Sequence, residues 1–234
     1  MTTQTLNGTS RPISRPLAVA VNSTWRENAA CAGKEAEDFF SDTPGTQRRV
    51  RSICHNKCPV LVRCLATILE SEGERGYKWG IYGGLTADQR RALRCEAILG
   101  NVPDLAQARM LTSLKWRHVL YPMRYRGANP TEMAQELEAY GLSVSPVTVR
   151  IAVWWLGGRA PVLPRRGAGD RRSDWQLIRD ECRTVVLQLR DGGATGYDIA
   201  AYLNVRRGAV EEAVRSWNRD ASASFSTVGE EMAA

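Results

Sequence analysis

The sequence predicts an all-α protein, in which a small helical four-cysteine domain is followed by two helix-turn-helix-like units. Apolar residues recur at helical spacing in each segment that follows the N-terminal tail. Gly, Pro, Ser and Thr stand between those segments, at positions that begin or end helices. Four of the six cysteines fall between residues 31 and 64. The first two observations predict the helices, and the third marks one domain as unusual.

The overall composition is that of a globular protein. The chain has 234 residues, of which 43% are hydrophobic and 24% charged. No run of 18 apolar residues is present, so we expect no membrane span. Residues 1–22 are polar and rich in Ser, Thr and Pro, and they lack the three parts of a signal peptide. We therefore expect a disordered tail over residues 1–22 and a cytoplasmic protein.

The formal net charge is +7, carried mostly by arginine, because lysine occurs only at positions 34, 57, 78 and 115. A basic chain suits a nucleic-acid partner. Arginine also forks phosphate and guanine edges better than lysine does. The alternative is a GC-rich genome, which favours arginine codons and says nothing about function.

Residues 23–100 form the predicted four-cysteine domain. Helical spacing joins the apolar residues Val50, Ile53, Val60, Leu61, Leu65, Ile68 and Leu69, and Pro59 either interrupts that helix or starts a new one. "SEGERGYKWGIYGGLT" predicts a glycine-rich turn, and Thr86 is a plausible N-cap for the helix that follows. Because the domain is small and short of core, a bound metal would help it to fold.

The rest of the chain divides into two helical units. In the first, residues 101–163, "LAQARMLTSLKWRHVLYPM" predicts one helix, and two further helices surround a turn near Gly141. Residues 164–172 are rich in Pro, Gly and Arg and are typical of a linker. In the second unit, residues 173–220, "DWQLIRDECRTVVLQLRDGG" predicts one helix, and two more again surround a turn. Residues 221–234 are expected to be a flexible tail.

The two units share an apolar pattern typical of helix-turn-helix motifs. Met133, Ala134 and Leu137 in the first correspond to Ile199, Ala200 and Leu203 in the second. If these are DNA readers, the second recognition helix covers about residues 206–217. The candidate DNA-contact residues are Arg206, Arg207 and Arg215 in the second unit, with Thr148 and Arg150 in the first. The alternative is a pair of plain helical hairpins with solvated arginines.

The cysteine spacing predicts a metal or cluster site. Cys31 is followed after 22 residues by Cys54, after three more by Cys58, and after five more by Cys64. Four thiolates can hold zinc or an iron–sulfur cluster. One remote and three grouped cysteines favour a cluster among helices over the paired ligands usual for zinc, although spacing alone does not decide. The neighbouring His55 is a further possible ligand; since four thiols are available, we expect it to face solvent.

Cys95 and Cys182 fall on apolar helix faces instead and are expected to be small core residues.

Four stretches together resemble the WhiB-like family of actinobacterial transcription regulators: "TWRENAACAG", "DFF", "CHNKCPVLVRCL" and "WGIYGGLTADQRRAL". The resemblance covers roughly Trp25 to Leu93, about a third of the chain. It implies a [4Fe–4S] cluster that is sensitive to oxygen and nitric oxide, held by Cys31, Cys54, Cys58 and Cys64. It further implies that the thiols can oxidise to disulfides when the cluster is lost.

The resemblance also implies a protein partner, the C-terminal domain of the primary sigma factor of RNA polymerase. The family's glycine turn packs at that surface, and the residues carried over to this chain are Gly80, Ile81, Tyr82, Gly83 and Gly84, with the aromatic pair Phe39 and Phe40. Tyr82 replaces the family's usual Trp, for which Trp79 is a possible substitute. The family has two residues between its second and third cysteines, whereas three, "HNK", stand here.

These features predict a redox-responsive transcription regulator that acts on DNA, on sigma factor, or on both. A zinc-stabilised DNA-binding protein without sensing is the second hypothesis. A thiol–disulfide reductase is the third; it lacks the Cys-x-x-Cys typical of that activity. Because the chain shows no phosphate loop, Ser/His/Asp arrangement or paired-carboxylate site, we expect no enzyme.

Overall fold

The computed structural model describes residues 23–72, 79–158, 160, 163 and 170–231, and every regular element in these ranges is helical. The predicted all-α class is thus confirmed for the described residues, whereas the tail of residues 1–22 and most of the predicted linker lie outside them. Two short 3₁₀ helices come first, η1 (Ser23–Asn28) and η2 (Ala36–Phe40). The α-helices are α1 (Pro44–Lys57), α2 (Leu61–Glu72), α3 (Ala87–Ile98), α4 (Leu105–Leu111), α5 (Leu114–Tyr125), α6 (Pro130–Ala139), α7 (Pro146–Trp155), α8 (Asp174–Glu181), α9 (Arg183–Asp191), α10 (Gly196–Leu203) and α11 (Arg207–Glu231).

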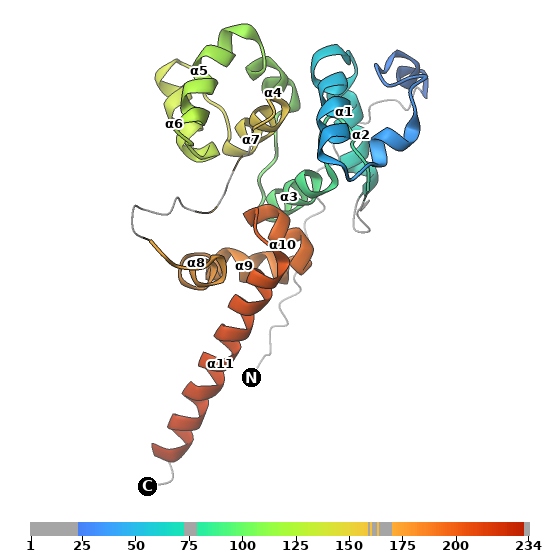
Figure 1. Ribbon diagram of the computed structural model, residues 1–234. Helices are drawn as coiled ribbons and strands as arrows, with labels where there is room; N and C mark the ends of the chain where they lie inside the picture. Colours follow the sequence, from blue (N-terminus) through green and yellow to red (C-terminus); the bar gives the residue numbers. More distant parts are fainter. Residues whose placement is uncertain (1–22, 73–78, 159, 161–162, 164–169, 232–234) are drawn as a thin grey trace, which may run out of the picture.

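Helix α3 lies at the centre of the molecule. Figure 1 shows α1 and α2 on one side of it, the group α4–α7 on another, and α8–α11 below. The long face of α3 packs along α10, which belongs to the most C-terminal group. The α3 helix therefore joins the cysteine region to a part of the chain about a hundred residues away.

Local sequence explains where α3 begins. The Thr86 hydroxyl accepts a hydrogen bond from the Gln89 amide, and the Gln89 side chain accepts one from the Thr86 amide. This reciprocal pair is a capping box, which satisfies two amides that the first helical turn leaves unpaired. The sequence-based assignment of Thr86 as the N-cap is confirmed.

Helix α7 is buried on all sides, which corrects the prediction that Thr148 and Arg150 face outward for DNA contact. Every residue from 147 to 155 is buried, including Thr148 at 0% and Arg150 at 3% exposure. The physical reason is the sequence VTVRIAVWW, which is apolar around the whole helix and must be enclosed. The buried Thr148 hydroxyl accepts a hydrogen bond from the Asp104 amide at 2.9 Å.

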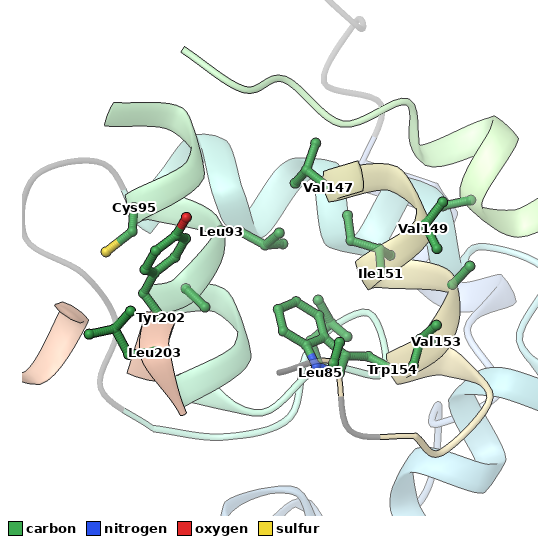
Figure 2. Close-up of a cluster of buried hydrophobic side chains, with 14 of the residues drawn as sticks. Leu85, Leu93, Cys95, Val147, Val149, Ile151, Val153, Trp154, Tyr202 and Leu203 are labelled. Carbon is green, nitrogen blue, oxygen red and sulfur yellow. The ribbon is translucent and has the colours of Figure 1, made fainter. Parts of the chain in front are cut away.

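Arg150 connects three helices through a buried charge. Its Nη1 lies 2.8 Å from Oε1 of the buried Glu96 on α3, and its guanidinium lies over the rings of Tyr202 on α10 and Trp154 on α7. Burial lowers the pKa of Arg150, and the charge of Glu96 opposes that effect. Figure 2 shows Tyr202 beside Cys95, with Leu93 pointing from α3 toward the apolar side chains of α7. This buried charge and its apolar surroundings form the junction of the three helix groups.

Two segments that the sequence predicted as single helices are each divided into two helices. The segment predicted as one helix from residue 105 divides into α4 and α5, because Ser113 takes an extended conformation and starts a new helix. The segment from residue 174 divides into α8 and α9 at Cys182, whose buried side chain faces the core. Residues 221–231, which belong to the predicted flexible tail, are helical and continue α11.

Both predicted helix pairs are present. In the second pair, Asn204 adopts the left-handed conformation at φ 57° and separates α10 from α11. The apolar positions matched between the units are buried in both: Met133, Ala134, Leu137, Ile199, Ala200 and Leu203. None of the helices in the described residues is long and apolar enough to cross a membrane.

Removing one partner of the Arg150–Glu96 pair should destabilise the protein strongly. We expect Glu96→Gln to lower the free energy of unfolding by about 3–5 kcal/mol, because it leaves a buried guanidinium without a counter-charge. The double variant Arg150→Met/Glu96→Gln should lose less than the sum of the two single variants. Urea unfolding measures both. Asp38→Asn is the control: it breaks the exposed Arg49–Asp38 pair and should cost less than about 1 kcal/mol. Additive losses would contradict the proposed coupling.

Candidate functional site

The four clustered cysteines come from three segments that meet beside α1 and α2. Cys31 lies in the turn between η1 and η2, and Cys54 lies on α1. Cys58 is the C-cap of α1 and has an extended backbone, so Cys54 lies within the helix and Cys58 directly after its end. Cys64 lies in the first turn of α2. The structure leaves all four as free thiols.

The four sulfurs influence one another electrostatically. Burial, and to a smaller extent negative charge on Cys58, Cys64 and Cys31, together raise the pKa of Cys54 to about 12. Burial raises the pKa of Cys64, as does charge on Cys31 and Cys58. Burial and the charge of Cys58 also raise the pKa of Cys31. Four thiolates this close together are unfavourable unless a positive metal centre compensates them.

Four free thiols match the ligand set of an iron–sulfur cluster. Within the described residues, no three His, Cys, Asp or Glu side chains are arranged to hold a metal ion. A single zinc ion, with metal–sulfur bonds of about 2.3 Å, requires close tetrahedral spacing of its ligands. A cluster of several iron and sulfide ions is larger than one zinc ion, so its ligand sulfurs lie farther apart. The four thiols therefore match a cluster by the chemistry of the donor set.

The glycine turn packs directly against these cysteines. Gly83 and Gly84 are buried with φ of +54° and +72°, a region that favours glycine. The backbone of Gly84 lowers the pKa of Cys54 by hydrogen bonding, and the backbone of Gly83 does the same for Cys64. A Cβ on Gly83 would lie 2.5 Å from the Cβ and 2.8 Å from the Cα of Leu65. Only glycine allows the turn to approach two of the four sulfurs so closely.

His55 does not face solvent, contrary to our expectation. Its ring is half-buried, and Nε2 lies 2.9 Å from the carbonyl oxygen of Gly84. Burial lowers the pKa of His55 to about 4, so the ring is neutral at pH 7 and its Nε2–H can donate to that carbonyl. His55, the residue after Cys54, therefore supports the turn and does not face solvent.

Arg90 is a site residue that sequence reasoning missed. Its side chain is 1% exposed and pairs with Glu72 at 2.8 Å. The guanidinium also donates to the carbonyl oxygens of Trp79, Gly80 and Leu85 at 2.9 to 3.2 Å. Five fixed donors suit arginine to holding several carbonyls together. The available signal was the position of Arg90 in the first turn of α3, directly after the glycine turn.

The predicted sigma-contact residues divide into an exposed and a supporting group. Trp79 is 65% and Phe40 51% exposed, whereas Gly83 and Gly84 are buried. Tyr82 is half-buried; its ring meets Phe40 edge-on at 6.3 Å. The half-buried Phe39 accepts a backbone hydrogen bond from Ile81, which ties η2 to the turn. Trp79 and Phe40 are thus the side chains of this set that can reach a partner.

A groove of about 1320 Å³ lies beside these aromatics. Phe39, Phe40, Trp79 and Gly80 line it on the cysteine side, and α3 contributes Arg91 and Arg94. Tyr197 and Asp198 of α10 also line it. The C-terminal group therefore forms part of the surface that surrounds the predicted contact residues.

Helix α7 contacts the glycine turn directly. Trp155 on α7 donates from Nε1 to the Gly83 carbonyl at 2.8 Å. Arg51 on α1 donates to the carbonyls of Gly84 and Trp154 at 3.2 and 2.7 Å, so it bridges the turn to α7. The turn is therefore connected to α7 by hydrogen bonds to the backbone and the terminal tryptophan of that helix.

Of the predicted DNA-contact residues, the three in the second unit are exposed. Arg206 lies in the turn before α11, with Arg207 and Arg215 on that helix. Arg207 pairs with Glu211, and Arg215 with Glu212 at 2.7 Å. Thr148 and Arg150 are buried in α7, as described above, and are withdrawn as DNA contacts.

Substituting Gly83 should reveal how tightly the turn packs. Gly83→Ala meets the Leu65 backbone and a positive φ, whereas Gly100→Ala meets only a positive φ of +82° with no atom within 4 Å. We expect Gly100→Ala to cost about 1–2 kcal/mol of stability from backbone strain, and Gly83→Ala a further 1–3 kcal/mol, roughly, from overpacking. Thermal or urea unfolding of both variants measures the difference. Equal losses would show that the turn is loosely packed.

Comparison with known proteins places this site in a family. A family model described as "Transcription factor WhiB" matches residues 25–93. The chain is 32% identical over 83 residues to the transcriptional regulator WhiB2 of Mycobacterium tuberculosis, an alignment that covers 36% of this chain and 88% of the relative. It is 34% identical over 74 residues to the transcriptional regulator WhiB of Streptomyces coelicolor, covering 32% and 79%. No solved structure matches the chain.

The match contains the four cysteines, the aromatic pair and the glycine turn, and it ends within α3. Similarity to the transcriptional regulator WhiB1 of Mycobacterium tuberculosis, 34% over 74 residues, covers 30% of this chain and 83% of that relative. The groups α4–α7 and α8–α11 lie beyond the family match. The expectation that the protein is a regulator rather than an enzyme is confirmed. This chain belongs to the WhiB family of transcription factors and carries a long helical extension C-terminal to the family domain.

Proposed function

We propose that this WhiB-family regulator holds a [4Fe–4S] cluster on Cys31, Cys54, Cys58 and Cys64 and responds to its redox state. The observation that carries the proposal is the glycine turn, which packs against the chain at two of the four cysteines: a Cβ on Gly84 would lie 3.4 Å from the Cβ of Cys54, and one on Gly83 would lie 2.9 Å from the amide nitrogen of Leu65, next to Cys64. Hydrogen bonds to ligand sulfurs are among the groups that set the potential and stability of such clusters. The turn and the thiols thus form one unit.

The chemistry of the thiols supports a responsive site. A bound cluster would supply positive metal charge and a redox-sensitive centre. This chain's residues surround the ligands with apolar side chains and fix two sulfurs by backbone bonds. Without the cluster, two thiols can form a disulfide by giving two electrons and two protons to an oxidant such as oxygen. Loss of the cluster removes a link between α1, α2 and the turn, and a disulfide replaces it with a cross-link between two of the four cysteines only.

The position of the turn supports an effect on partners. Trp79 and Phe40 are exposed beside it, and the turn also bonds to α7 through Trp155. We infer that these aromatics contact the C-terminal domain of the primary sigma factor, as the family resemblance implies. Arg206, Arg207 and Arg215 remain the proposed DNA contacts of the second helix pair. The zinc-stabilised alternative keeps the same ligands but has no redox response.

Metal analysis of protein purified without oxygen tests the cluster. We expect iron and acid-labile sulfide with visible absorption, and we expect each of Cys31→Ala, Cys54→Ala, Cys58→Ala and Cys64→Ala to lose most of both. Cys95→Ala and Cys182→Ala are matched controls, because these thiols are buried in the helical core away from the turn. They should keep the iron. Colourless protein with stoichiometric zinc would reject the sensor and favour the structural alternative.

Trp79→Ala should weaken binding to a primary sigma factor C-terminal domain without destabilising the fold, because its side chain is 65% exposed. An interface tryptophan that acts as a hot spot contributes about 2 kcal/mol or more, roughly a 30-fold change in Kd. Tyr140→Ala, which removes an exposed aromatic at the C-cap of α6, is the control. Calorimetry or fluorescence titration with holo protein measures both. Equal affinities for the two variants would contradict the assignment of the turn surface.

A further inference from the structure

Helix α5 carries exposed positive charge that no function assigned so far uses. Between Leu105 and Thr131 the chain has no acidic residue but contains Arg109, Lys115, Arg117, Arg124 and Arg126. The buried face of α5 is formed by Trp116, Leu120 and Met123. The opposite face is exposed and presents Leu114, Lys115, His118, Tyr121 and Tyr125. Helix α5 is therefore packed on one side only.

The charges on α5 are not neutralised within the described residues. Arg117 donates to the Thr112 carbonyl, and Arg124 donates to the Leu156 carbonyl. Lys115 lies over the ring of its neighbour Trp116. A carbonyl orients a guanidinium but leaves its full charge in place, and each guanidinium has further donors available. All three cations of α5 therefore lack a carboxylate partner in the part of the chain described here.

Helix α11, which the sequence singled out, differs in this respect. Arg207 pairs with Glu211, and Glu212 accepts from both Arg215 at 2.7 Å and Arg219 at 3.3 Å. These glutamates offset most of the positive charge on the exposed face of the helix. Of the two helices, α5 presents the more uniformly positive surface to a polyanion.

The side chains on α5 are also of the right kind for phosphate. Lysine, arginine and tyrosine all donate hydrogen bonds to backbone phosphates of DNA. Tyr125 is 97% exposed and Tyr121 44%, so both phenol groups are accessible. The exposed face of the helix thus combines Lys115 with two accessible hydroxyl donors, and the half-buried Arg117 and Arg124 lie at its edge.

We propose that α5 is a DNA-backbone contact of this regulator, with Lys115, Arg117 and Arg124 and the hydroxyls of Tyr121 and Tyr125 facing phosphates. This inference rests on the proposed DNA-binding function and locates part of it outside the family domain. It transfers the DNA contact of the first helical unit from the buried α7 to the exposed α5. The contact is sequence-independent, because it reaches phosphates rather than base edges.

The test is a conservative variant, Lys115→Gln/Tyr121→Phe/Tyr125→Phe, which keeps the rings and removes one charge and two hydroxyls. The control, Arg48→Gln/Tyr140→Phe, removes a charge and a hydroxyl at exposed positions on α1 and α6. The full-length holo protein is titrated with a mixed-sequence duplex of about 30 base pairs at several salt concentrations. We expect about a 3- to 10-fold loss of affinity for the α5 variant and a salt slope smaller by about 1. The control should change less.

The other outcomes separate the inference from the proposed function. If the wild-type protein binds the duplex and the α5 variant matches the control in affinity and salt slope, the α5 contact is wrong while DNA binding stands. If the variant loses affinity for the sigma domain but not for DNA, α5 docks a protein and the proposal is overturned. If the wild-type protein does not bind the duplex, both the α5 contact and the DNA part of the proposed function fail.

Discussion

The buried ion pair between Arg150 and Glu96 is the constraint on which the rest of the structure depends. It brings α7 against α3, and Tyr202 on the far side of the guanidinium adds α10. Because an isolated buried charge is far more costly than a paired one, the three helices must assemble together. The pair also joins the extension to α3, the helix in which the family match ends, because Glu96 lies on α3 and Arg150 deep in the extension.

The proposed cluster site is connected to that junction by side chains from α3 and α7. Arg90, which donates to the carbonyls before and after the glycine turn, projects from the same α3 helix that carries Glu96. Trp155, five residues after Arg150 on α7, donates to the turn from the other side. The turn is thus held between two helices that the buried pair fixes relative to each other. These hydrogen bonds connect the cysteine region to a helix that lies beyond the family match.

Much of the fold could be predicted from local signals, and the errors share a cause. Thr86 with Gln89, and Ser145 with Pro146, are local patterns, and the structure confirms the helices they begin. The prediction for Arg150 was wrong because a charged residue on a short helix usually indicates an exposed face. Its buried partner, Glu96, is 54 residues away in sequence, so no local pattern indicates the pairing. The four-cysteine set was visible from spacing. The support for it, from Arg90, His55 and Trp155, depends on tertiary contacts that no local pattern encodes.

The most direct test of the central claim is native-state hydrogen exchange on the full-length protein across a urea series, followed at amides of α2, α3 and α10. If α3 joins the cysteine domain to the C-terminal helices in one cooperative unit, the opening free energies of all three helices converge on a single value as urea increases. If α10 opens independently at lower free energy while α2 and α3 stay protected, the extension is a separate domain. In that case the buried pair would not be the constraint that holds this structure together.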